Sequence, residues 1–147
     1  MKIVINDPKA GQSFQRELEA AKSTQLYGKK IGETLEGALV GLGGYTLQIT
    51  GGSDSDGAPM RFDILGTRRT HALLTQGTGV RHLKKGVRLK KRVTGNTVSE
   101  RTAQLNAKIS IYGPQALADL GFVPKVKEKK AVEPKPAEKP KGKKGKS

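Results

Sequence analysis

The sequence predicts a mainly β fold: a compact small β-barrel with one or two short helices and a disordered basic C-terminal tail. Three observations support this prediction. Apolar and polar residues alternate in several short runs, the 19 glycines separate these runs with turns, and the segment 125–147 contains ten lysines but almost no large apolar side chain. Short alternating runs between glycine turns are typical of barrels and sandwiches. We therefore divide the chain into a folded β domain, 1–124, for which RNA binding is argued below from its charge, and a disordered Lys/Pro-rich tail, 125–147.

The first segments are expected to form two strands and a short helix. Residues 2–6 alternate into an apolar run that ends in an Asn-Asp-Pro combination, which predicts a turn. In 13–26, the spacing of Phe14 and Leu18 suits a helix, but the same residues also suit a strand; we favour a strand followed by a short helix. The stretch 28–44 contains six glycines and is expected to form short strands and turns.

Three short strands are predicted in the central part of the chain. Residues 45–50 alternate between apolar and polar side chains, as in a half-buried strand, which is expected to end at Gly51 and Gly52. Residues 64–65 and 72–74 fit two further short strands ahead of a glycine turn.

The segment 86–95 is predicted to be a basic strand or extended ribbon. Alternation along it would bury one set of side chains and project the other. The buried set is Val87, Leu89 and Val93, and the projecting set is Arg88, Lys90 and Arg92.

The body is expected to close with a strand at 104–112, preceded by a short extended piece at 97–99. Gly113 and Pro114 would stop this strand. A short helix at 114–119 would follow, because proline is favoured at the first positions of a helix.

Positive charge is concentrated in one part of the chain. Residues 81–92 contain seven Lys or Arg and no acid, whereas residues 1–60 contain six bases and seven acids. Such a run repels itself unless it faces a polyanion, and binding to phosphates releases condensed counterions. Because 68–101 holds no Phe, Tyr or Trp, contact with the backbone of folded RNA is favoured over base stacking.

Other classes of function find little support in the sequence. The chain has no cysteine, no apolar run of membrane-spanning length and no signal-peptide pattern, so we expect a cytoplasmic protein without a membrane partner. His71 and His82 lack metal-ligand spacing, while Asp54 and Asp56 lack a nearby nucleophile. We therefore expect no metal, no cofactor, no small-molecule substrate and no enzymatic activity.

A glycine-rich polar loop spans 51–60, within the sequence ITGGSDSDGAPM. Its glycines permit a positive φ or close backbone approach, and Asp54 can bond loop amides in an Asx-type turn. A tight connection is the simplest interpretation. A phosphate-binding loop is disfavoured, because no Gly-Lys-Ser or Gly-Lys-Thr ending and no following helical pattern are present.

This segment resembles the signature of the archaeal and eukaryotic family called small-subunit ribosomal protein S-six of the eukaryotic type. The resemblance continues to Ile109 and covers nearly the whole body. It implies a structural constituent of the small ribosomal subunit that binds and stabilises folded ribosomal RNA on the cytoplasmic ribosome, beside neighbouring ribosomal proteins. The chain has Ala58 where the family often has an aromatic residue. It lacks the long helical extension of the eukaryotic members and is similar to the short archaeal form.

Two sets of candidate site residues follow. The RNA-binding candidates are the bases in and around the basic run: Arg61, Arg68, Arg69, Arg81, Lys84, Lys85, Arg88, Lys90, Lys91, Arg92 and Arg101. The structural signature loop is expected to depend on Gly51, Gly52, Asp54, Gly57, Pro59 and Met60. The alternative function is a free-standing DNA-binding or nucleoid-compacting protein, since a basic body with a lysine-rich tail also suits duplex DNA.

Overall fold

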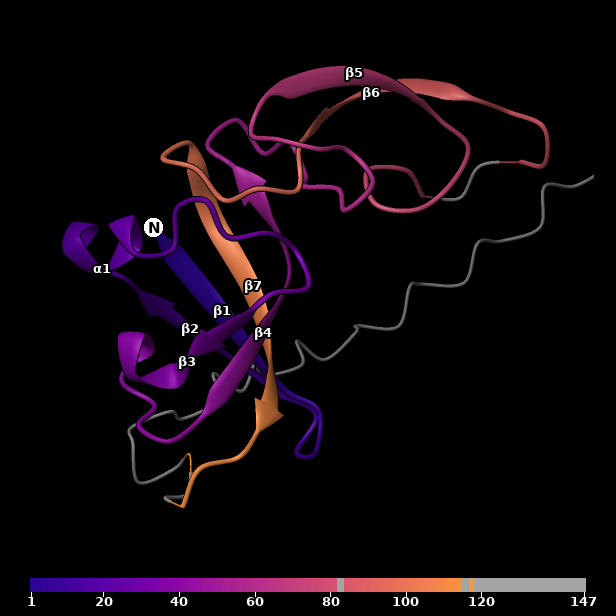
Figure 1. Ribbon diagram of the computed structural model, residues 1–147. Coiled ribbons are helices and arrows are strands. Elements are labelled where there is room, and N and C mark those ends of the chain that lie inside the picture. The colour runs from indigo at the N-terminus through magenta and orange to yellow at the C-terminus, as the bar shows by residue number, and fades with distance from the viewer. Residues whose placement is uncertain (82–83, 115–116, 118–147) are drawn as a thin grey trace, which may run out of the picture.

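The computed structural model describes residues 1–81, 84–114 and 117. These residues form a five-stranded sheet, a two-stranded ribbon and two short helical segments (Figure 1). In chain order the elements are β1 (Lys2–Asp7), β2 (Gln12–Glu17), α1 (Ala20–Thr24), β3 (Thr34–Glu36), the 3-10 helix η1 (Gly37–Val40), β4 (Thr46–Asp54), β5 (Arg69–Leu74), β6 (Leu89–Thr94) and β7 (Thr102–Ile111). The predicted mainly β fold is confirmed.

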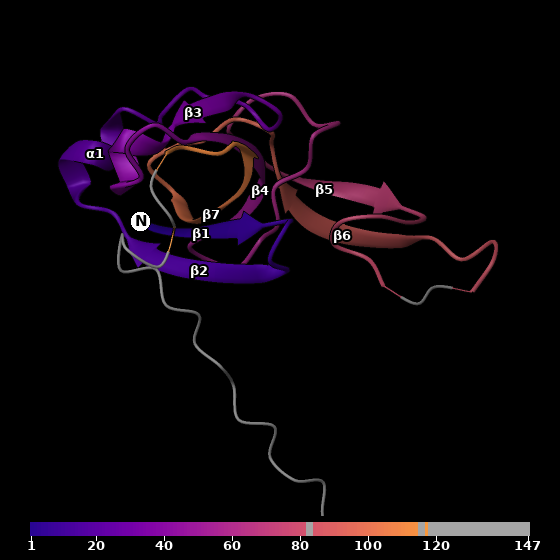
Figure 2. The same ribbon diagram turned by 90° about the horizontal axis from the view of Figure 1, so that it is seen from below.

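The main sheet has the strand order β2-β1-β7-β4-β3. β1 pairs in parallel with β7, and the other neighbours are antiparallel. The predicted closure into a barrel is wrong, because the edge strands β2 and β3 do not pair with each other within the described residues. The sheet curves, and α1 lies on the side between its two edges (Figure 2). Leu26, which follows α1, and Leu42, which follows η1, are buried in the core of the main sheet.

The core of the main sheet is built from alternating apolar side chains of its three central strands. Ile3 and Ile5 on β1, Leu47 and Ile49 on β4, and Leu105 on β7 are all almost completely buried. Full burial of such a side chain contributes about 1.5 to 3 kcal/mol relative to exposure. The period-two pattern that predicts these strands is therefore the same pattern that fills the core.

β4 continues through the glycines at which the sequence predicted its end. A bulge shifts its register between Ile49 and Gly51, and pairing with β7 then resumes to Asp54. A Cβ atom on Gly52 would lie 2.5 Å from the carbonyl oxygen of Gln104 and 2.9 Å from Met60 Sδ. This glycine is thus required by close packing of the backbone and not by a positive φ. The strand prediction failed here because glycine usually weakens or ends a strand.

The β5–β6 ribbon extends away from the main sheet (Figure 1) and has a small apolar cluster of its own. The cluster contains Leu74, Val80 and Val93. The prediction that Val87 and Leu89 are buried beside Val93 is wrong: they are 42% and 38% exposed. A two-stranded ribbon offers little surface to pack against, so burial stops near the end of β6 that adjoins the body.

Two predicted segments need separate comment. Residues 64–65 lie in an irregular segment that follows a turn at 62–63, and not in a strand. Most of the predicted helix at 114–119, and the whole predicted tail at 125–147, lie outside the described residues. Within the described part of the chain, no helix has both the length and the apolar character needed to cross a membrane.

Candidate nucleic-acid interface

The signature loop turns the chain back on β4. The amide of Asp54 donates to the carbonyl of Ala58 at 2.9 Å, and the amide of Gly57 donates to the carbonyl of Asp54 at 2.9 Å. Gly57 has a φ of +76°, which favours glycine at that position. The Met60 amide then donates to the Gly52 carbonyl at 3.0 Å, and the Met60 side chain is buried. The loop is a tight connection, as its simplest interpretation predicted.

Arg69, the first residue of β5, ties this loop to the ribbon. Its Nε donates to Asp54 and its Nη1 donates to Asp56, while its Nη2 donates to Ser55 Oγ at 3.1 Å. The Asp54 side chain is fully buried. The hydrogen bond from Arg69 lowers the pKa of Asp54, against the opposing effect of burial. The main partner of Asp54 is therefore the guanidinium group of Arg69, 15 residues later in the sequence. The amide of the neighbouring Ser55 is a second donor to Asp54, at 2.6 Å.

Arg61 makes a second bracing contact at the other side of the ribbon. Its guanidinium donates to both carboxylate oxygens of Asp63, at 2.8 and 2.7 Å, and to the carbonyl of Thr78 at 2.8 Å. Only 11% of its side chain is exposed. The hydrogen bond from Arg61 lowers the pKa of Asp63. Arg61 thus holds the 77–79 turn against the start of the segment that leads to β5.

The remaining predicted RNA-binding residues are exposed. They are Arg68, Arg81, Lys84, Lys85, Arg88, Lys90, Lys91, Arg92 and Arg101. Within the described residues, Arg92 is the one member of this set with an ion pair, at 4.0 Å from Asp56. We call the eight of them other than Arg101 the ribbon cations, because they lie on β6, in the loop before it or directly ahead of β5. Arg101 lies apart from them, in the turn before β7.

The register of the ribbon places cations on both of its faces. His71 pairs with Arg92 and Leu73 with Lys90, whereas Ala72 pairs with Lys91 on the opposite face. Backbone hydrogen bonds anchor the base of the ribbon: the Arg61 amide donates to the Thr94 carbonyl at 3.0 Å, and the Thr94 amide donates to the Pro59 carbonyl at 2.9 Å. The ribbon is therefore a projecting cationic element with a fixed base.

No metal site is formed by the described residues: nowhere among them do three or more His, Asp or Glu side chains gather in a suitable cluster. His71 is exposed on the ribbon, and His82 lies outside the described residues.

These features define a small basic β protein with a projecting cationic ribbon and a tightly braced glycine loop. The family model described as Ribosomal protein S6e matches residues 1–121. The chain therefore belongs to this ribosomal protein family.

Several archaeal proteins named small ribosomal subunit protein eS6 are similar to it. The protein from Methanocaldococcus jannaschii is 45% identical over 119 residues, which cover 81% of this chain and 88% of that protein. The protein from Methanosphaera stadtmanae is 44% identical, with coverage of 81% and 90%. The protein from Archaeoglobus fulgidus is 41% identical, with coverage of 81% and 93%.

Family membership confirms several predictions made from the sequence. The resemblance to this family and to its archaeal form is correct, and the chain has a structural role in the ribosome. It is a structural ribosomal protein and not an enzyme, and it is a component of cytoplasmic ribosomes.

Proposed function

We propose that this chain binds and stabilises folded ribosomal RNA in the small subunit, beside neighbouring ribosomal proteins, through the ribbon cations. The observation that carries this proposal is their exposure: eight Lys and Arg side chains lie on or next to one projecting ribbon. Among the described residues a single acid, Asp56, forms an ion pair with one of them, at 4.0 Å. In the free protein, the like charges of the ribbon cations repel one another, and this repulsion does not stabilise the fold. Phosphates bound along the ribbon would relieve it and release counterions.

Such a ribbon recognises the shape and the charge of the RNA and not the identity of its bases. β5, β6 and the connection between them contain no Phe, Tyr or Trp on which bases could stack. Cations on both faces of the ribbon, such as Lys90 and Lys91, suit a position between two phosphate backbones of folded RNA.

The proposal gives Arg61 and Arg69 a different role from that of the ribbon cations. Both guanidinium groups are engaged by carboxylates of the protein, so they position the ribbon. The signature loop acts through the same contacts, because Asp54 holds Arg69 and Gly52 permits the close approach of β7. RNA contact then falls to the exposed cations, with Arg101 as a separate peripheral contact.

The test compares two triple variants that remove the same charge. One combines Lys84→Ala, Lys90→Ala and Lys91→Ala on the ribbon. The matched control combines Lys22→Ala, Lys30→Ala and Lys108→Ala, three exposed lysines elsewhere on the body. In filter binding to small-subunit ribosomal RNA, the ribbon variant should lower the slope of log K against log salt by about 2 to 3 units, at roughly 0.7 to 0.9 per phosphate contact.

The control variant should leave that slope nearly unchanged. Equal slopes for the two variants would overturn the proposal, because charge alone would then account for binding. Duplex DNA competitor separates the alternative function: competition by DNA as strong as by ribosomal RNA would favour a DNA-compacting protein.

A further inference from the structure

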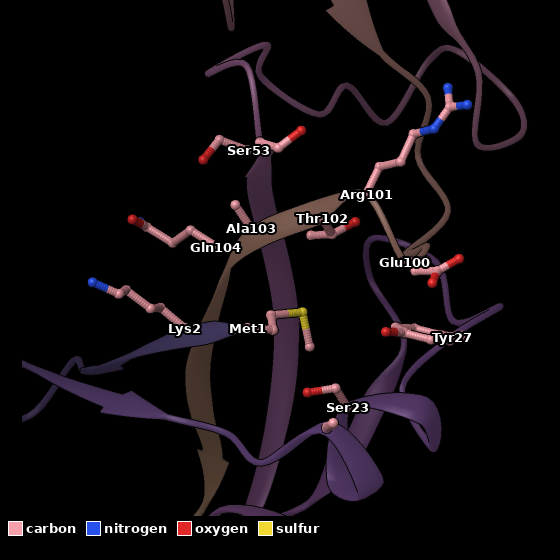
Figure 3. Close-up of a pocket in the computed structure, with 12 residues that line it drawn as sticks. Met1, Lys2, Ser23, Tyr27, Ser53, Glu100, Arg101, Thr102, Ala103 and Gln104 are labelled. Atoms are coloured by element: carbon pink, nitrogen blue, oxygen red, sulfur yellow. The ribbon is translucent and has the colours of Figure 1, made fainter.

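A pocket of about 630 Å³ lies between α1, the start of β1 and the junction of β4 with β7 (Figure 3). Its lining includes Lys2, Ser23, Tyr27, Ser53, Glu100 and Gln104. The volume is within the range of pockets that hold small ligands or single nucleotides. None of the ribbon cations lines it, although Ser55, which accepts from Arg69, and the candidate Arg101 do.

Backbone hydrogen bonds fix the walls of this pocket. The amide of Gly28 donates to the Val98 carbonyl at 3.0 Å, and the Val98 amide donates to the Lys29 carbonyl at 2.8 Å. These bonds set the position of Tyr27 relative to the turn that carries Glu100. The Ser55 amide donates to the Arg101 carbonyl at 3.0 Å and joins the same turn to the end of β4. The pocket is therefore preformed in the free protein.

The side chains of the pocket combine the groups that recognise a nucleotide. Tyr27 is 39% exposed, and Glu100 lines the same pocket and is labelled near Tyr27 in Figure 3. An exposed aromatic ring stacks with an unpaired base, and a carboxylate accepts hydrogen bonds from the Watson–Crick edge of that base. Lys2 lies at the other rim, where it forms an ion pair with Glu17 at 3.4 Å. Both side chains are more than half exposed, so this pair is weak and Lys2 can exchange Glu17 for a phosphate.

We propose that this pocket takes an unpaired guanine nucleotide of the bound RNA; the proposal rests on the proposed function and extends it to a second contact. Guanine presents two adjacent donors, N1–H and N2–H, to one carboxylate. Uracil presents a single N–H between two carbonyl oxygens, which the Glu100 carboxylate would repel. Because the Glu100 carboxylate is negatively charged and repels phosphate, a base edge and not a phosphate faces the Glu100 side of the pocket. The ribbon thus recognises the shape of the RNA, whereas the pocket recognises the identity of one base.

The experiment uses the full chain and two fluorescein-labelled RNA hairpins that differ in one position, a bulged guanine or a bulged uracil. Fluorescence anisotropy should show tighter binding of the guanine hairpin, by about 10-fold. Tyr27→Ala should weaken binding of the guanine hairpin by about 10-fold, the effect of losing one stacked base. Tyr27→Phe retains the ring and should bind as the unchanged protein does. Glu100→Ala should bring the guanine-to-uracil ratio close to one.

Glu33→Ala is the matched control for Glu100→Ala, because it removes one exposed carboxylate that is not part of the pocket lining. It should raise affinity for both hairpins alike and leave their ratio unchanged. Suppose that the unchanged protein binds the two hairpins equally and that the ribbon triple variant weakens the binding of both. This result would overturn the proposal for the pocket and leave the proposed function standing. Failure of both hairpins to bind at low salt would overturn the proposed function and the pocket with it.

Discussion

At the residue scale, Arg69 determines how the signature loop and the ribbon are joined. Its guanidinium group contacts Asp54, Ser55 and Asp56, so one side chain holds together three consecutive loop residues and the first residue of β5. Hydrogen bonds to charged groups contribute more than neutral ones when the acceptor is buried. The Asp54 carboxylate is such an acceptor. The sequence alone does not reveal this pairing, because many Lys and Arg residues compete as partners for two loop acids.

Asp54→Ala should destabilise the protein by about 2 kcal/mol, since it removes a buried charged acceptor. Asp54→Asn should have a smaller effect, because an amide oxygen can still accept from the Ser55 amide. Urea unfolding of the free proteins measures both effects. Unchanged midpoints for both variants would show that Arg69 holds the loop through Asp56 alone.

Acid should destabilise the folded protein through three aspartates, of which Asp63, beside Arg61, is one. The pKa of Asp54 is lowered, chiefly by Arg69. Burial acts to raise the pKa of Asp7, but hydrogen bonds from the Tyr112 hydroxyl, at 2.6 Å, and from nearby amides outweigh it, so its pKa is lowered too. The unfolded chain then takes up protons first as the pH falls.

The free energy of unfolding should accordingly be level above about pH 5 and decrease as the pH falls below the ordinary aspartate pKa of about 3.9. Urea titrations at several pH values between these limits give the measurement. Asp54→Asn should make the acid decrease shallower. A decrease of equal depth in this variant would assign the effect to other groups.

Gly51 and Gly52 are neighbours with different constraints, and they offer a matched pair. A Cβ atom on Gly52 would collide with a backbone oxygen of β7, whereas a Cβ atom on Gly51 would meet nothing within 4 Å. Gly52→Val should therefore destabilise the protein by about 2 to 3 kcal/mol, as overpacking does. Gly51→Val should be close to neutral. Denaturant midpoints compare them, and equal effects would contradict the packing account.

At the scale of elements, alternation predicts strands well where one face is buried in the main core. β1 and β7 were predicted within a few residues, because their apolar side chains recur every second position and pack inward. β2 and α1 were also predicted within a few residues, but from the spacing of Phe14 and Leu18 and not from alternation. Along β6 the same alternation was misleading. Val87 and Leu89 repeat the pattern, but only the end of the strand near Val93 has an element to pack against.

The two ends of the ribbon should therefore differ in their contribution to stability. Val93→Ala, at a fully buried position, should cost about 2 kcal/mol. Leu89→Ala should cost well under half as much, although it removes the larger side chain, because this residue is 38% exposed. Thermal unfolding of the two variants gives the comparison. A larger loss for Leu89→Ala would mean that the ribbon tip packs more closely than the structure indicates.

At the scale of the whole molecule, composition indicated the class of partner, and the motif indicated the family. The concentration of cations in one segment was visible in the sequence, and the structure gathers them on the projecting ribbon. The pocket around Tyr27 was not predictable. Its walls come from residues near both ends of the body, and only the pairing of β1 with β7 brings Lys2 beside Gln104.

The predicted tail gives a test that involves the whole chain. Removal of residues 125–147 takes away ten lysines but almost no large apolar side chain, so the melting temperature should change little while RNA affinity falls. Calorimetry and filter binding on the truncated protein measure the two effects. A large drop in melting temperature would show that the tail packs on the body.

The parallel pairing of β1 with β7 also affects how the protein folds. The first strand to leave the translating ribosome must wait for the last, since Lys2 pairs with Gln104. Until then, one edge of β1 has no hydrogen-bonding partner, and an unpaired apolar strand invites capture by other chains. Contacts between such distant segments also slow folding, because a long loop must close first. A protein destined for ribosome assembly thus completes its central sheet late in synthesis, and its nascent form is the one most exposed to aggregation.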